Sequence, residues 1–220
     1  MLGLNISEPT VSRYLKRLKP RGNAEKAQRW LVFLKNHREV IAALDFFTVP
    51  TLTFRVLYCL FVIEHGRRRI LHFNATAHPT SEWIVQQLRE AFPLPSPYRY
   101  VVLDRDAKFN PDVLGTLEAS GIVPIQTSAR SPWQNGTAER WVGSCRREMV
   151  DHIIPLNEEH LRRLGREYLS YYHGDRTHKG LGKQTPAGRS VESRLNHRCK
   201  FLAVPRVGGL HHRYRWSSAA

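Results

Sequence analysis

The sequence predicts an α/β fold built on a mixed five-stranded sheet flanked by helices. Three runs rich in β-branched or aromatic residues come first, and then a helix, a strand, a second helix and a fifth strand follow. This order is typical of a mixed sheet covered by helices. The 220 residues can form one domain of ordinary size with extensions at its ends, and the 41% hydrophobic content is compatible with a globular core.

The first three strands are expected near residues 39–48, 54–63 and 69–75. The second of them contains the longest apolar run considered, eight residues, which is typical of a central strand. No stretch approaches the roughly 18 uninterrupted apolar residues of a membrane span, so a membrane partner is not expected.

Helices and strands then alternate. We expect a helix at 81–91, a strand at 99–104, a helix at 110–120 opened by Asn110 and Pro111, and a strand at 122–126. A loop at 127–135 should precede two further helices. These are expected over 137–153 and 158–172.

The N-terminal segment 7–18 has the pattern of an amphipathic helix, with an apolar stripe at positions 11, 14, 15 and 18. Its other faces carry cations that are candidate DNA contacts: Arg13, Lys16 and Arg17. The segment resembles the recognition helix of a helix-turn-helix; the alternative is a helix that simply packs on the core. Earlier helices would be needed to cover the stripe, so we expect an N-terminally truncated protein. Residues 19–23 are expected to form a linker.

The net charge of +15 is unevenly distributed along the chain. Residues 1–38 and 183–220 together carry +14, and the middle of the chain only +1. Basic extensions on a near-neutral core favour nucleic-acid binding, although basic tails that merely aid solubility are the alternative. We expect three parts: a basic helix-turn-helix-like segment and linker (1–38), a core (39–190) and a basic, aromatic tail (191–220).

The three cysteines, Cys59, Cys145 and Cys199, are widely spaced and form no zinc-binding pattern. An odd number of separated cysteines favours reduced thiols in the cytoplasm. The N-terminus lacks the basic and apolar regions of a signal peptide. Cys59 lies in an apolar strand and is expected to be a small buried hydrophobe.

Three carboxylates occur where a lone acid would be costly. Asp45 ends one apolar run, Asp104 ends a second, and Glu139 opens a predicted helix. A carboxylate at the end of a buried strand needs a partner or a cation, because desolvating it alone is too unfavourable. Three such oxygen ligands suit Mg²⁺ or Mn²⁺. The pattern therefore indicates metal-dependent chemistry on phosphate esters.

The spacing of these acids, 58 and 34 intervening residues, resembles the D…D-x(34/35)-E pattern of DDE transposases and retroviral-integrase-like catalytic cores. Three further segments, at 103–109, 131–139 and 172–186, resemble the family's S-D-x-G-x-x-F, H-P-x-x-N-G-x-x-E and Y-N-x-x-R-x-H-x-x-L…T-P motifs. The resemblance covers roughly residues 39–190 and rests on several independent motifs.

The resemblance implies a ribonuclease H-like fold in which the first and fourth strands are neighbours, so that Asp45 and Asp104 meet. It also implies two divalent ions held by Asp45, Asp104 and Glu139, about 4 Å apart. The implied activity is transposition or integration: water first frees a 3′-hydroxyl, which then attacks target DNA. Implied partners are the element ends and a target duplex, bound by a homo-oligomer in the bacterial cytoplasm, associated with the nucleoid.

The chain departs from the family at Asp106, where a glycine is usual two places after the second acid. A glycine there would allow positive φ or close backbone approach. Asp106 is therefore either a turn residue or a rival metal ligand. We favour Asp104 as the ligand because it directly follows the strand.

Several cations near the acids are candidate DNA contacts: Arg140, Arg146, Arg147 and Lys179. Arg146 should share a helix face with Glu139, where it could hold a substrate phosphate or neutralise the acid. His173 and His178 are expected to make polar loop contacts and not to bind metal. The alternatives for function are a nuclease of the same fold and an inactive DNA-binding remnant.

Overall fold

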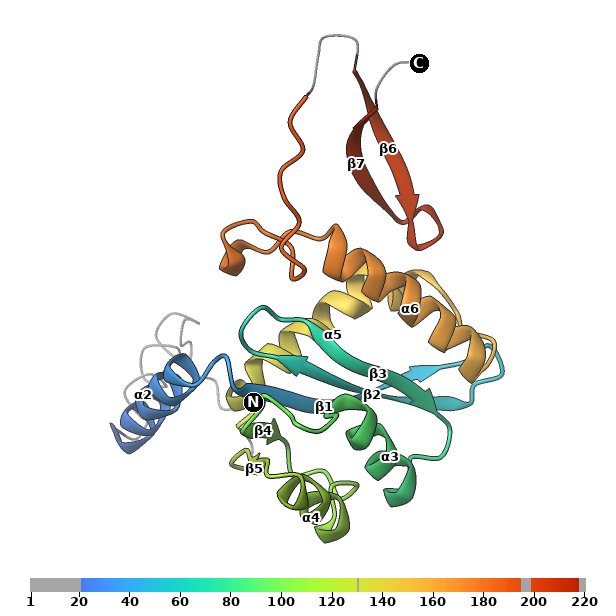
Figure 1. Cartoon of the computed structure of the whole chain (residues 1–220). Coiled ribbons are helices and arrows are strands. Elements are labelled where there is room, and N and C mark those ends of the chain that lie inside the picture. The colour runs from blue at the N-terminus through green and yellow to red at the C-terminus, as the bar shows by residue number, and fades with distance from the viewer. Residues whose placement is uncertain (1–20, 130, 195–198, 218–220) are drawn as a thin grey trace, which may run out of the picture. The chain divides into compact units, whose positions relative to one another are not determined.

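The computed structural model describes residues 21–129, 131–194 and 199–217 (Figure 1). The chain divides into two compact units, residues 1–37 and 38–220. The first unit contains helix α2 (Arg21–Asn36). The linker predicted at 19–23 is therefore wrong from Arg21 onward, because a proline just before a helix is compatible with its first turn and good helix formers follow. The helix predicted at 7–18, with Arg13, Lys16 and Arg17, lies outside the described residues.

The second unit is built on the predicted mixed sheet, with strand order β3-β2-β1-β4-β5. The five strands are β1 (Ile41–Pro50), β2 (Val56–Glu64), β3 (Ile70–Thr76), β4 (Tyr100–Leu103) and β5 (Val123–Gln126). The β1–β2 and β2–β3 pairs are antiparallel, and the β1–β4 and β4–β5 pairs are parallel. The predicted adjacency of the first and fourth strands is confirmed.

Strands β1 and β4 stay paired only over part of their lengths. Ile41 pairs with Tyr100 and Ala43 with Val102, after which β4 ends at Leu103 while β1 continues beside β2 to Pro50. Beyond Ala43, β1 therefore has no described strand paired on its β4 side. A polar side chain can be accommodated at this point of an otherwise buried strand.

Four helices cover the sheet: α3 (Ser81–Ala91), α4 (Pro111–Ala119), α5 (Gly136–Glu148) and α6 (Glu158–Gly174). All four were predicted. Side-chain oxygens cap three of their N-termini, from Thr80, Asn110 and Asn157. The helix predicted at 137–153 is shorter than expected, because α5 ends at Glu148 and a separate 3-10 turn, η2 (Val150–His152), follows buried Met149.

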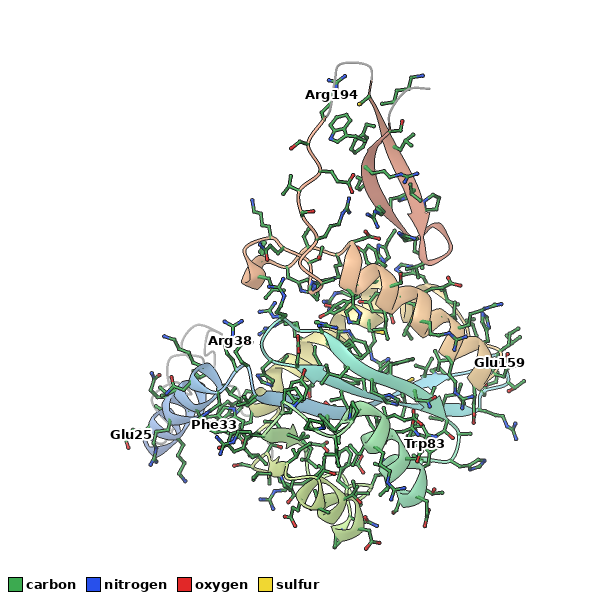
Figure 2. The ribbon with its side chains drawn as sticks, in the orientation of Figure 1. Glu25, Phe33, Arg38, Trp83, Glu159 and Arg194 are labelled. Atoms are coloured by element: carbon green, nitrogen blue, oxygen red, sulfur yellow. The ribbon has the colours of Figure 1, made fainter. Side chains whose placement is uncertain are left out.

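The helices lie in two layers, with α3 and α4 on one face of the sheet and α5 and α6 on the other (Figure 1). Alternate side chains of a strand point to opposite faces. Leu44, Leu60 and Leu103 accordingly pack with Leu88 of α3 and Leu117 of α4. Figure 2 shows the same layers with their side chains, with Trp83 marking α3 and Glu159 marking the start of α6.

The second layer is aromatic. Trp141 of α5 is 2% exposed and its ring lies 4.2 Å from the ring of Phe61 and 5.9 Å from that of Phe47, centroid to centroid. Phe73 of β3 packs in the same cluster and occupies the space opposite Gly165 of α6, where a Cβ atom would collide with its ring. This packing fixes α5 and α6 against the strands that carry the acids.

The segment after residue 190 contains an antiparallel pair, β6 (Lys200–Arg206) and β7 (His211–Ser217), to which sequence analysis assigned no regular structure. The pair is held at Asp175, whose side chain is 3% exposed and lies 2.9 Å from Arg206 Nε and 3.6 Å from Arg213 Nε. Arg189 approaches the same carboxylate at 3.3 Å. No helix within the described ranges is long and apolar enough to cross a membrane.

Candidate active site

The fold brings Asp45, Asp104 and Glu139 to one region. Asp45 lies on β1 two residues beyond its last pairing with β4, and Asp104 directly follows β4. Continuing that parallel register places the two aspartates side by side. Glu139 lies in the first turn of α5 and is exposed.

The charges of these acids influence one another. The pKa of Asp45 is raised to about 7, first by burial and then by the neighbouring carboxylates of Asp104, Glu139 and Asp106. The N–H of Phe46 donates to Asp45 Oδ1 at 2.8 Å and opposes this rise. A half-buried acid surrounded by other acids lacks a compensating cation, and a bound divalent ion would supply one.

Asn135 is a site residue to which sequence analysis gave no role. It is 3% exposed, and its Nδ2 lies 3.5 Å from both Asp45 Oδ2 and the carbonyl oxygen of Leu44. Its Oδ1 is buried with no hydrogen-bond partner. The signal for this residue was present in the Asn-Gly of the 131–139 motif, but only the structure shows the amide beside Asp45.

Asp106 behaves as a turn residue. Its N–H donates to Asp104 Oδ1 at 3.0 Å, and its own carboxylate accepts from the Lys108 N–H at 2.9 Å and from Lys108 Nζ at 2.8 Å. Burial alone would raise the pKa of Asp106, but the hydrogen bonds from Lys108 lower it on balance. Asp106 is not among the described residues with positive φ, so this backbone does not require the family's usual glycine.

A hollow of about 360 Å³ adjoins Asp104. The hollow is also lined by Asp106, Thr127 and Ser128. Arg105, another lining residue, donates from Nε to the Thr127 carbonyl oxygen at 2.9 Å. The second acid is therefore reachable by a ligand.

The donor set fits a hard divalent cation, because it consists of carboxylate and amide oxygens. In the described part of the chain, no three His, Cys, Asp or Glu side chains are close enough to form a ready-made metal site. Binding of an ion would therefore have to draw the acids together.

Comparisons with known proteins agree with this geometry. Residues 120–186 match the family model described as "Integrase core domain". The simian T-cell lymphotropic virus intasome, solved with PP2A regulatory subunit B56 gamma, is similar over 81% of this chain at 12% identity, with a TM-score of 0.55. The family model covers less than half of this chain, and a structural likeness at this identity shows a shared fold.

Smaller solved structures give the same result for the fold. The HTLV-2 integrase catalytic core domain in complex with magnesium is matched over 94% of its length and 68% of this chain, at 12% identity and a TM-score of 0.52 for its trimeric form. Its dimeric form gives 10% identity and the same TM-score. These likenesses show that the fold is ribonuclease H-like, as predicted. No curated protein sequence matches the chain, and the chain spans 66% of the intasome chain's length.

Arg146 contacts residues of β1. Its Nη2 donates to the Thr48 carbonyl oxygen at 3.1 Å, and its guanidinium lies 5.7 Å from the centroid of the Phe47 ring. No ion pair between described residues reaches Glu139. Neutralisation of Glu139 by Arg146 is therefore not seen, and Arg146 instead links α5 to the end of β1.

The motif at 172–186 forms the junction between α5 and α6. Arg176 donates to the Glu148 carboxylate at 2.6 and 2.8 Å, and His173 Nε2 accepts from the Ile70 N–H at 2.8 Å. His178 is buried and its ring lies edge-on to Tyr172 at 5.0 Å between centroids. Both histidines make polar contacts, since His178 Nδ1 lies 3.2 Å from Arg176 Nη1, but His173 lies in the last turn of α6 and not in a loop as predicted. Cys59 is buried, as predicted.

Proposed function

We propose that this chain catalyses metal-dependent phosphodiester hydrolysis and DNA strand transfer, as a DDE transposase or integrase. The observation that carries the proposal is the side-by-side register of Asp45 and Asp104 where β4 leaves β1, with Glu139 of α5 near enough to raise the pKa of Asp45. These three acids from separate segments lie in one region without forming a ready-made metal site, and none of the three has an ion-pair partner among the described residues.

Asp45, Asp104 and Glu139 would hold the divalent ions, Mg²⁺ or Mn²⁺. Bound there, two such ions would neutralise the charge that develops on the entering and leaving oxygens at phosphorus. Asn135 would orient the Asp45 carboxylate through its amide group. Asp106 is already engaged with Lys108 and would stay a turn residue.

The proposed substrate is DNA, comprising element ends and a target duplex. Candidate contacts on the described surface are Arg140 and Arg147, which are exposed on α5, with Arg146 and the exposed Lys179. Basic residues of the N- and C-terminal extensions that form no internal ion pair would add charge-driven affinity for DNA. Assembly of several copies on DNA is part of the proposal, since one similar structure is described as an intasome and others as trimeric and dimeric forms.

The test compares Asp104→Asn with Asp106→Asn in a Mg²⁺-dependent strand-transfer assay on labelled duplexes. Asp104→Asn should abolish joined products and weaken Mn²⁺ binding measured by calorimetry, while its DNA affinity stays within about twofold. Asp106→Asn should keep both the joined products and the Mn²⁺ affinity.

Each other outcome points to a specific alternative. A dead Asp106→Asn with an active Asp104→Asn would move the second ligand to Asp106. Cleavage without joining by the wild type would indicate a nuclease. Binding without any cleavage, and without Mn²⁺ affinity, would indicate an inactive DNA-binding remnant.

A further inference from the structure

A basic pocket of about 350 Å³ lies beside α5, at its junction with the β2–β3 turn and the short helix η3 (Lys179–Leu181). Its volume falls within the range of small-ligand sites, about 300–1,000 Å³. Successive helix residues point about 100° apart, so Arg140 turns toward this pocket while Glu139 turns toward the acids. The pocket and the candidate active site therefore occupy different flanks of one helix.

Cations dominate the lining of this pocket. It is lined by Arg68, Arg140, Arg176 and Lys179, and no carboxylate belongs to its lining. Arg176 is held by Glu148. Between described residues, no hydrogen bond or ion pair reaches the side chains of Arg68, Arg140 or Lys179.

Arg68 is crowded by like charges. Burial lowers its pKa first, and the neighbouring guanidinium of Arg140 lowers it further, with smaller contributions from Arg38 and Arg176. Three unpaired cations around one cavity create a positive potential that an anion would relieve.

The backbone around Arg68 holds it in this position. Arg68 has a φ of 62°, a conformation that side-chain-bearing residues rarely adopt. The neighbouring Arg67 turns away and donates to the carbonyl oxygens of Pro186, at 2.9 Å, and Thr185, at 3.1 Å. Gly180 leaves space for the Arg68 guanidinium, because a Cβ at position 180 would collide with it.

We propose that this pocket binds one backbone phosphate of a DNA strand through Arg68, Arg140 and Lys179. The proposal rests on the proposed function for its choice of DNA. A strand crossing the exposed face of α5 would place one phosphate in the pocket and another near Glu139. Gly143 lies on that face without a side chain, and Arg147 lies 3.1 Å from where its Cβ would be. Ser144 and Thr177 line the pocket and offer hydroxyl donors to the same anion.

The test uses the salt dependence of duplex binding by the full chain, measured by fluorescence anisotropy. Each phosphate contact contributes about 0.9 to the log–log slope. If the three cations share one phosphate, Lys179→Gln, Arg140→Gln and the triple variant with Arg68→Gln should each lower the slope by about 0.9. Three independent contacts would instead give a loss of about 2.7 in the triple variant, and that result would overturn the pocket.

Lys179 and Arg140 are exposed, so their variants carry the test even if Arg68→Gln perturbs folding. The matched control is Arg163→Gln, an exposed cation of α6 about 13 Å along the helix axis from Tyr172 at the pocket. It should leave the slope unchanged. A loss in the control equal to that in the pocket variants would mean that general surface charge is responsible, and would overturn the proposal.

A second arm identifies the source of the phosphate. Duplexes with a single uncharged methylphosphonate should lower the wild-type slope by about 0.9 at one position and have no further effect in Lys179→Gln. Inorganic phosphate that binds the wild type saturably, with unchanged DNA slopes in every pocket variant, would overturn the DNA assignment.

Failure of the pocket and failure of the proposed function are distinguishable. Wild-type strand transfer together with unchanged slopes overturns only the pocket. Lowered slopes in a chain that joins no DNA support the pocket and overturn the enzymatic activity.

Discussion

Replacing Glu148 by Gln tests whether the junction between α5 and α6 is held by a single carboxylate. That carboxylate accepts from Arg176 Nη2 at 2.6 Å, from Arg176 Nε at 2.8 Å and from the Tyr168 hydroxyl at 3.1 Å. The side chains of Glu148 and Arg176 are 20% and 22% exposed. Gln keeps the shape but removes the charge, leaving Arg176 beside the cations of the pocket.

The expected cost follows from these contacts. Breaking a fully buried pair from one side costs about 3–5 kcal/mol, because the remaining charge loses its partner. With about a fifth of each side chain in water, and with Gln still able to accept a hydrogen bond, we expect about 2 kcal/mol. For a unit of this size that corresponds to a drop of about 4–8 °C in Tm.

The assay is urea unfolding of the wild type, Glu148→Gln, Arg176→Gln and the double variant. Residues in direct contact show coupling energies of about 0.5–3 kcal/mol, so the double variant should be more stable than the sum of the single losses implies by about 1 kcal/mol or more. A loss below about 0.5 kcal/mol in Glu148→Gln, or strictly additive losses, would refute this account of the junction.

Four further results are expected. Gly180→Ala should change the free energy of unfolding by less than about 1 kcal/mol, because only the flexible end of Arg68 must move. The same variant should weaken duplex binding, and unchanged binding would argue against the pocket. Asn135→Ala should slow strand transfer more than it weakens DNA binding, and equal losses in both measurements would mean that Asn135 does not position Asp45. Burial, and then the neighbouring Arg69, lowers the pKa of His173 from 6.5 to about 4, so the unfolded state binds the proton first as the pH falls and the free energy of unfolding should decrease from pH 6.5 toward 4. His173→Gln, which can still accept from the Ile70 N–H, should show a shallower decrease in urea titrations at several pH values. Removing residues 1–38 should lower the salt slope of DNA binding, and an unchanged slope would locate the contacts on the core.

The meeting of Asp45 with Asp104 could be predicted because both follow apolar runs and the family resemblance implies that the first and fourth strands are neighbours. The helix at 81–91 could be predicted to the residue, since its apolar spacing and its Thr80 cap are local signals. Local signals of this kind need no knowledge of distant contacts.

Long-range contacts were not predictable in the same way. The pocket joins Arg68 to Lys179, residues more than a hundred positions apart, and nothing in either local pattern indicates the other. Asn135 was visible as a motif residue and Arg146 through its helical spacing from Glu139, but their partners, Asp45 and Thr48, lie on a strand about ninety or more residues earlier. The β6–β7 pair was missed because its charged and aromatic composition also suits an unstructured tail.

The early end of the β1–β4 pairing leaves the three acids on supports of two kinds, a pair on neighbouring strands and a third on the first turn of a helix. The pairing of β1 with β4 ends two residues before Asp45 and Asp104, so their backbones cannot move far apart, whereas Glu139 precedes the packed Trp141 on α5. The segment 127–135 connects β5, which ends at Gln126, to α5, which carries Glu139. The short helix η1 (Pro132–Asn135) lies at the end of this segment. Changes in the length or sequence of that segment can therefore shift the first turn of α5, which carries Glu139, without disturbing the strands that carry the first two acids. Chains that share this sheet can differ in how readily their active sites assemble while their cores remain the same.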